Sequence, residues 1–192
     1  MKRTRRFFAA FTLIELMLVI SIIMVLAGLT LFTVSSYRYN AKVSLAKNAI
    51  AALSLKIEAY RIDNGDVPRS DATDVLDARL DTDATSAVYK DASLTLYVEI
   101  SGDVNLSRTP PSRDSDIRAY WAFPPWMIPP GTSVEYLSDP FNNAFGYSTK
   151  YSADVRAGSS DPGGFNPTFD LWCTSDIEQT GTTPRSSWLT NW

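Results

Sequence analysis

The sequence contains no histidine, a single cysteine at position 173, and no proline before Pro68. The lack of histidine removes the most common general base and the most common metal ligand. A single cysteine excludes an internal disulfide, so an exported domain of this chain depends on its core or on a bound ion. There is also no Gly-rich phosphate loop, Ser/His/Asp set or Cys/His cluster, which argues against an enzyme.

Charge is unevenly distributed at the start of the chain. Lys2, Arg3, Arg5 and Arg6 are basic, and no acidic residue precedes Glu15. The whole chain has a formal net charge of −3, so the part after this basic start is acidic. A nucleic-acid-binding protein needs a clustered basic face, and we therefore predict no nucleic-acid partner.

Residues 11–34 form a long apolar run whose one charge is Glu15. A helix rises about 1.5 Å per residue, so this run is long enough to cross a hydrocarbon core of about 30 Å. The preceding basic residues place the N-terminus in the cytoplasm and the rest of the chain outside. The run therefore predicts a single membrane-spanning helix in contact with the lipid bilayer.

Three interpretations of this run compete. It is a secretory signal cut after Ala27, a plain anchor whose Glu15 reaches the lipid headgroups, or a segment that stays on the mature protein after removal of a leader, residues 1–10. The run is longer than a secretory signal, which has 7–15 apolar residues as a rule. A carboxylate inside a span costs about 2.5–3.5 kcal/mol, so Glu15 favours the third interpretation.

The sequence AFTLIE at residues 10–15 resembles the cleavage site of type IV pilins and type II secretion pseudopilins, with Ala10 where glycine is usual. The resemblance implies cleavage between Ala10 and Phe11 and N-methylation of Phe11. It also implies that Glu15 meets the Phe11 amine of a neighbouring subunit. Opposite charges in a low-dielectric setting need such a partner.

The helix is predicted to continue through residues 35–63, which contain no glycine or proline. Apolar residues recur there at spacings of three and four and form one stripe, so this half is amphipathic. Asn64 and Gly65 supply the stop. The members of the stripe are Val43, Ala46, Ile50, Leu53, Ile57 and Tyr60.

Residues 64–192 are predicted to form a periplasmic α+β globular domain. The stretches 60–68 and 139–147 resemble the end of the first helix and the turn before the sheet in major, G-type pseudopilins. In the turn, Asn142 and Asn143 tolerate a left-handed backbone. Residues 147–153 and 168–174 are predicted as antiparallel strands that cover the apolar stripe. The resemblance thus implies a pilin-like fold, a long helix on a small antiparallel sheet with a loop-rich insert.

Residues 69–133 match no part of that family pattern. We expect a short helix at 74–80, capped by residues 71–74. Residues 93–101 alternate like a strand but also form one helical face, and we favour a helix that stops at residues 101–103. An aromatic cluster in residues 103–133 is expected to form a local core rather than a ligand platform.

Residues 169–176 resemble the last core strand of G-type pseudopilins and the start of their calcium loop. Asp176 lies near the first aspartate position and Glu178 follows, but the second acidic part of the pattern is missing. The two alternatives are a calcium ion held by Asp176, Glu178 and carbonyl groups, and a polar loop without an ion. Cys173 is expected to be a small buried residue on the strand rather than a reactive thiol.

The resemblance implies a structural subunit of a pilus-like filament that grows from the inner membrane and drives protein export. Its expected partners are further copies of the chain in a helical homopolymer, minor pseudopilins, the prepilin peptidase and an inner-membrane assembly platform with an ATPase. The assembled filament is expected in the periplasm or at the cell surface. Two alternatives remain, a major or minor type IV pilin for adhesion or motility, and an anchored periplasmic enzyme or binding module.

Overall fold

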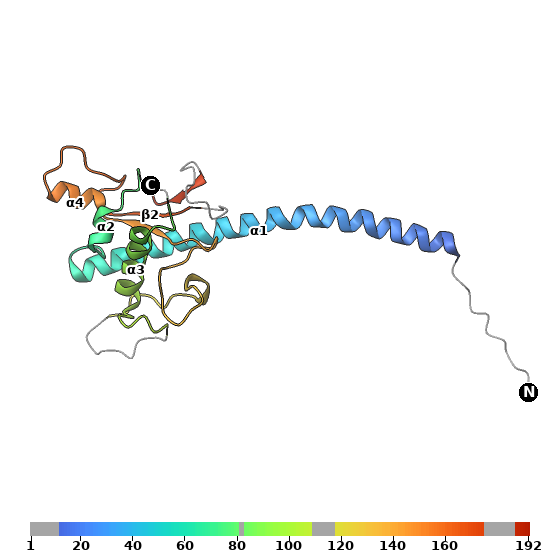
Figure 1. Cartoon of the computed structure of the whole chain (residues 1–192), viewed down its shortest axis with the longest axis horizontal. Helices are drawn as coiled ribbons and strands as arrows, with labels where there is room; N and C mark the ends of the chain where they lie inside the picture. Colours follow the sequence, from blue (N-terminus) through green and yellow to red (C-terminus); the bar gives the residue numbers. More distant parts are fainter. Residues whose placement is uncertain (1–11, 81–82, 109–117, 175–186) are drawn as a thin grey trace, which may run out of the picture. The chain divides into compact units, whose positions relative to one another are not determined.

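The computed structural model describes residues 12–80, 83–108, 118–174 and 187–192, and for residues 29–36 it describes the backbone alone (Figure 1). The chain forms two compact units that join in sequence between Ala41 and Lys42. The described elements follow this order: α1 (Leu13–Asn64), α2 (Asp71–Val75), α3 (Ala87–Ser101), the 3₁₀ helix η1 (Pro125–Met127), β1 (Gly146–Ser148), α4 (Lys150–Arg156), β2 (Asp170–Cys173) and β3 (Leu189–Thr190).

In the first unit, the described side chains of α1 are exposed on all sides of the helix. Every residue from 12 to 28 is exposed, and Leu13 and Met24 are 76% and 70% exposed. The predicted continuous helix is confirmed, because α1 extends without interruption from Leu13. In the described part of the chain, no helix is both long enough and apolar enough to cross a membrane.

In the second unit, α1 buries one face. Ala46, Ile50, Leu53 and Ile57 are at most 5% exposed, whereas Leu55 on the other face is 67% exposed. The predicted apolar stripe is therefore confirmed. Its burial supplies a large part of the domain core, because each fully buried aliphatic side chain contributes about 1.5–3 kcal/mol.

The helix α1 ends where the sequence predicts. Gly65 has a positive φ of 83°, and its N–H donates to the carbonyl oxygen of Arg61 at 2.8 Å. Glycine adopts this left-handed backbone without the steric cost that a Cβ imposes.

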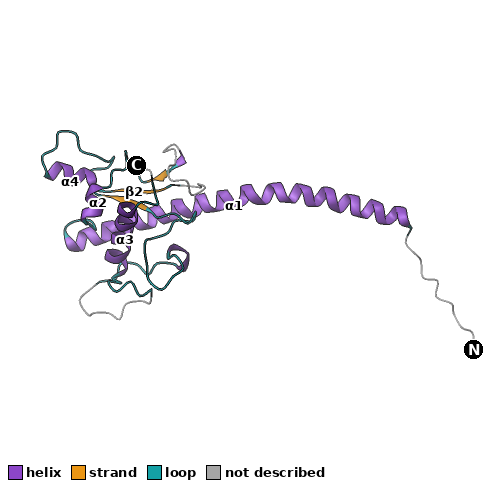
Figure 2. Cartoon of the chain, viewed as in Figure 1, coloured by secondary structure: helices purple, strands orange, loops and turns teal. Residues whose placement is uncertain are grey.

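The sheet has three short antiparallel strands in the order β1-β2-β3, shown in orange in Figure 2. Gly146 of β1 lies opposite Trp172 of β2, and Trp172 lies opposite Thr190 of β3. Leu171 and Cys173 of β2 belong to the same buried cluster as the α1 stripe. The architecture is thus α+β, with the long helix packed with a small antiparallel sheet, as predicted.

A close approach in this sheet requires glycine at position 146. A Cβ there would lie 2.0 Å from the Cε2 atom of Trp172, whose ring is completely buried. Trp172 stacks on Trp188 with ring centroids 5.5 Å apart, and Tyr89 makes a T-shaped contact with Trp172 at 5.6 Å between ring centroids. The missing side chain at Gly146 therefore makes room for an aromatic cluster on the second side of β2.

The helical alternative for residues 93–101 is confirmed by α3. The helix begins earlier than expected, after Ser86, whose side chain accepts a hydrogen bond from the backbone of the first turn. It ends at Gly102, which has a φ of 72°. Leu96 and Ile100 are fully buried, so the helical face of this segment contributes to the core.

The short helix predicted at 74–80 is misplaced. The helix α2 begins at Asp71, because Ser70 forms a reciprocal capping box with Thr73, and it ends at Val75. Leu76 then takes an extended backbone and is 1% exposed. Burial of Leu76 redirects the chain at the point where the sequence pattern alone allowed the helix to continue.

The strand predicted at 147–153 is also wrong beyond Ser148, where β1 ends and α4 follows. The backbone N–H of Thr149 donates to the carbonyl oxygen of Thr73 in α2 at 2.9 Å. The Ser148 hydroxyl accepts a hydrogen bond from the Lys150 N–H at 3.1 Å. These contacts turn the chain out of the sheet, so tertiary hydrogen bonds override the alternating pattern.

The aromatic residues of the 103–133 insert extend the main core instead of forming a separate one. Trp121 and Phe123 are partly buried against the cluster that contains the α1 stripe. Phe123 lies 4.9 Å from Trp121 and 5.4 Å from Tyr97 of α3, measured between ring centroids. The insert thus packs on α3, and its one described helical piece is η1.

Two leucines on one helix test this packing. Leu53→Ala should lower the free energy of unfolding by about 2–5 kcal/mol, because it removes a fully buried side chain and leaves a cavity. Leu55→Ala is the matched control and should change it by less than about 0.5 kcal/mol. Denaturant unfolding of the full chain in detergent measures both. Equal losses in the two variants would contradict the assignment of the buried face.

Candidate functional site

The first turn of α1 holds the one charged side chain of the apolar run, that of Glu15. Its Oε2 atom accepts hydrogen bonds from the backbone N–H of Thr12 at 3.0 Å and from the Thr12 hydroxyl at 2.9 Å. The Glu15 N–H donates in return to Oγ1 of Thr12 at 3.3 Å. This is a capping box, in which Thr12 precedes the helix and Glu15 occupies its third position.

The capping box leaves half of the carboxylate available. Both hydrogen bonds to Glu15 end on Oε2, and no residue of the described chain donates to Oε1. The N-terminal end of a helix also carries a partial positive charge, which favours a carboxylate there. Glu15 is thus held in a fixed place by its own helix while Oε1 can accept from an external donor.

The apolar surroundings of Glu15 favour a hydrogen-bond donor from outside the chain. The adjacent residues Leu13, Ile14 and Leu16 are 76%, 73% and 59% exposed, so Glu15 lies on a helix whose surface is apolar. In an apolar environment a half-satisfied carboxylate is costly, whereas a cation within reach offsets that cost.

The predicted cleavage residues Ala10 and Phe11 lie outside the described residues. The structure therefore places Glu15 alone among the three predicted N-terminal site residues. It adds Thr12, which our reading of the sequence passed over. The spacing Thr-x-x-Glu before an apolar run is itself a capping-box signature, so the signal was present in the sequence.

The predicted calcium residues Asp176 and Glu178 also lie outside the described residues. Within the described ranges, no group of three or more His, Cys, Asp or Glu side chains could hold a metal ion.

The turn at residues 139–143 has the form that the sequence predicts. Asn142 has a φ of 69°, which is a left-handed backbone. The Oδ1 atom of Asp139 accepts hydrogen bonds from the N–H groups of Phe141 at 2.8 Å and Asn143 at 2.9 Å. Asp139 thus closes the turn that leads into β1.

The second oxygen of Asp139 contacts the single cysteine. The Cys173 Sγ donates to Oδ2 of Asp139 at 2.9 Å, and both residues are buried. Burial raises the pKa of the Asp139 carboxyl from 3.8 to about 6, although the hydrogen bond from Cys173 works in the opposite direction. The prediction that Cys173 is buried on a strand is confirmed, and its bond to Asp139 is an additional finding.

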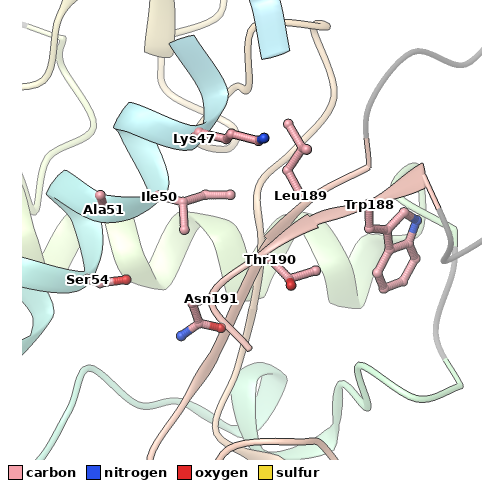
Figure 3. Close-up of a pocket in the computed structure, with 8 residues that line it drawn as sticks. All are labelled: Lys47, Ile50, Ala51, Ser54, Trp188, Leu189, Thr190 and Asn191. Carbon is pink, nitrogen blue, oxygen red and sulfur yellow. The ribbon is translucent and has the colours of Figure 1, made fainter. Parts of the chain in front are cut away.

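A groove of about 520 Å³ lies between α1 and β3 in the second unit (Figure 3). Its lining contains one charged side chain, that of Lys47, and no acid, cysteine or histidine. Such a lining offers neither a general base nor an activated nucleophile. The lining residues are Lys47, Ile50, Ala51, Ser54, Trp188, Leu189, Thr190 and Asn191.

Comparison with known proteins gives two matches. Residues 5–31 match the family described as the prokaryotic N-terminal methylation motif. The chain is also 42% identical over 60 residues to the type II secretion system core protein G of Pseudomonas aeruginosa. The matched part is 31% of this chain and spans 42% of that relative, which is less than half of its length. No solved structure matches the chain.

The matched residues contain the predicted cleavage residues and Glu15, so the N-terminal motif expected from AFTLIE is confirmed. The chain carries this prepilin-type motif at residues 5–31. The segment similar to core protein G is the second finding that bears on its function.

The buried Asp139 predicts a pH dependence of stability. Because its pKa is raised in the folded state, the folded protein holds this proton more tightly than the unfolded chain, and the contribution of Asp139 to stability falls as pH rises from about 4 to 6. The shift corresponds to about 3 kcal/mol. Asp139→Asn keeps the acceptor at Oδ1 and cannot ionise, so its unfolding free energy should depend less steeply on pH in this window.

Denaturant unfolding of the full chain at several pH values between 4 and 7 measures this difference. The control is Asp91→Asn, which removes an exposed acid from α3 and should keep the wild-type slope. An Asp139→Asn slope equal to that of the wild type would contradict the raised pKa.

Proposed function

We propose that this chain is a structural, non-enzymatic subunit of a pilus-like filament, a type II secretion pseudopilin that assembles from the inner membrane and drives protein export. The observation that carries the proposal is the methylation motif at residues 5–31, in which Glu15 is the one charge of the apolar run. The similarity to a type II secretion core protein supports the choice of system.

The proposed subunit waits in the inner membrane with its apolar segment, residues 11–34, in lipid. The apolar side chains from Leu13 to Leu26 support this placement, because the described part of the chain leaves all of them exposed. The basic residues before Phe11 favour a cytoplasmic N-terminus. The amphipathic half, residues 35–63, and the domain of residues 64–192 then lie in the periplasm with a pilin-like fold.

Maturation in this proposal removes residues 1–10 and exposes a new amine on Phe11, which is then N-methylated. The prepilin peptidase is the expected partner for this step. Phe11 adjoins Thr12, so the new positive charge arises next to the capping box of its own helix. Each proposed subunit then has both a carboxylate and a cation at the start of its helix, so the cation of one subunit can pair with the carboxylate of the next.

The assembly step joins the free half of Glu15 to a neighbour. Oε2 stays in the capping box with Thr12, and Oε1 accepts from the Phe11 amine of the adjoining copy. Transfer from lipid into a bundle of like helices keeps the apolar surface away from water. The charge pair therefore sets the axial register of the helical homopolymer. Minor pseudopilins and an assembly platform with an ATPase are the further expected partners.

The N-terminal mass of the protein isolated from its native membranes tests the pathway. The proposal predicts a mature chain that begins with N-methylated Phe11. A chain that begins at Gly28, or an uncut chain that begins at Met1, would contradict it and return the protein to the secreted or simply anchored classes.

A pair of substitutions separates the two roles of Glu15. Glu15→Gln can still form the capping box but carries no charge, so the helix should begin normally while filament yield falls at least about tenfold, since the neighbouring amine is left unpaired. Thr12→Val removes the capping hydroxyl and keeps the charge, and should reduce the yield less. Circular dichroism and filament counts by electron microscopy measure both. Wild-type assembly by Glu15→Gln would refute the charge pair.

A further inference from the structure

Three consecutive residues of α1, Tyr37, Arg38 and Tyr39, form a polar and aromatic segment beyond the apolar run. We propose that this segment is a headgroup collar: its tyrosines lie in the interfacial layer of the bilayer, and Arg38 binds lipid phosphate. The inference rests on the membrane placement proposed above. It adds a lipid-binding site on the periplasmic side of the span.

The arrangement of the three side chains around the helix favours lipid over a protein partner. Successive residues of an α-helix point about 100° apart, so three in a row cover more than half of its circumference. Tyr37 is 76% exposed, Tyr39 is 41% exposed and Arg38 is also exposed. A docked protein contacts one face of a helix, whereas a lipid layer surrounds it.

The described surface at the start of the same helix has the same all-round character. Every described side chain from residue 12 to 28 is exposed, with apolar residues on each side of the helix. A helix that packs on a protein from one side has a one-sided apolar stripe, such as the one that α1 shows at Ala46 and Ile50. The collar therefore lies on the same helix as a surface suited to lipid.

The position of the collar along the helix matches the thickness of a bilayer. Tyr37 lies 24 residues after Leu13 within α1, which is about 36 Å along the helix axis. The hydrocarbon core is about 30 Å thick, and the headgroup layers extend it to about 40–45 Å. When Leu13 lies near one boundary of the core, the collar lies in the headgroup layer of the other.

The chemistry of the collar suits that layer. Tyrosine is enriched at membrane interfaces, because its ring is apolar and its hydroxyl is polar. Arg38 forms no ion pair with any residue that the structure describes, unlike Arg69 with Asp74 or Arg156 with Asp66. A guanidinium group binds phosphate with two parallel hydrogen bonds, so lipid phosphate is a fitting acceptor.

Depth measurements on the full chain test the collar. A spin label on Asn40→Cys is placed in vesicles of phosphatidylglycerol and phosphatidylcholine, and its access to oxygen and to a water-soluble nickel complex reports its depth. Cys173 is fully buried, and labelling of the wild-type chain supplies the blank. We expect the label at phosphate depth. In the variant Tyr37→Ser/Arg38→Gln/Tyr39→Ser it should move by about 3 Å, the rise of two residues, or more.

Two further variants keep the test specific. Lys47→Gln removes an equivalent exposed charge from α1 outside the collar and should leave the label depth unchanged. Tyr37→Trp/Arg38→Lys/Tyr39→Trp keeps interfacial side chains and should preserve the depth. An unchanged depth in the serine and glutamine variant would overturn the collar.

A second label separates this failure from a failure of the proposed function. At Val19→Cys the label should have high access to oxygen and low access to nickel, because it lies in the hydrocarbon core. If the Val19 label is reached by nickel, then the membrane placement itself fails. If the Val19 label is shielded but the collar variant does not shift the Asn40 label, then only the collar fails.

Discussion

The whole molecule depends on a change in the apolar pattern of one helix. Near its start, α1 exposes apolar side chains on every side, and later it concentrates them in a stripe that the domain buries. Among the described residues, the apolar side chains at the start of α1 are exposed, whereas those of the stripe pack in the core of the domain. The domain can therefore fold on Ala46, Ile50, Leu53 and Ile57 while the side chains at the start of the helix stay exposed, which the proposed function assigns to lipid and to other copies. In the proposed function, one helix therefore has both a folding role and an assembly role.

Much of the fold could be predicted from the sequence, because local rules decide it. The stripe on α1 follows from helical spacing, and the stops at Gly65 and Gly102 follow from the left-handed backbone that glycine accepts. The turn at Asn142 follows from the same preference. In each case the determining contacts lie within a few residues, where a single sequence is informative.

The remaining features depend on contacts between distant residues. Thr149 is drawn out of the sheet by a hydrogen bond to Thr73, so α4 replaces a predicted strand. The strand β3 has two residues and exists through its pairing with β2, which no local pattern reveals. At the candidate site the sequence indicated Glu15 and its external partner, but the geometry adds that Oε2 is already held by Thr12. In the proposed filament, that division of the carboxylate would let Glu15 cap its own helix through Oε2 and accept from a neighbouring subunit through Oε1.

The contact between Glu15 of one subunit and Phe11 of the next can be measured directly in assembled filaments. Filaments grown from an equal mixture of ¹⁵N-labelled and ¹³C-labelled subunits, studied by solid-state NMR, report only nitrogen–carbon contacts between different subunits. The account predicts a cross-peak between the Phe11 amine nitrogen and the Glu15 carboxyl carbon, which Glu15→Gln removes or weakens. A well-ordered filament without this cross-peak would contradict the central claim that the charge pair joins neighbouring helices.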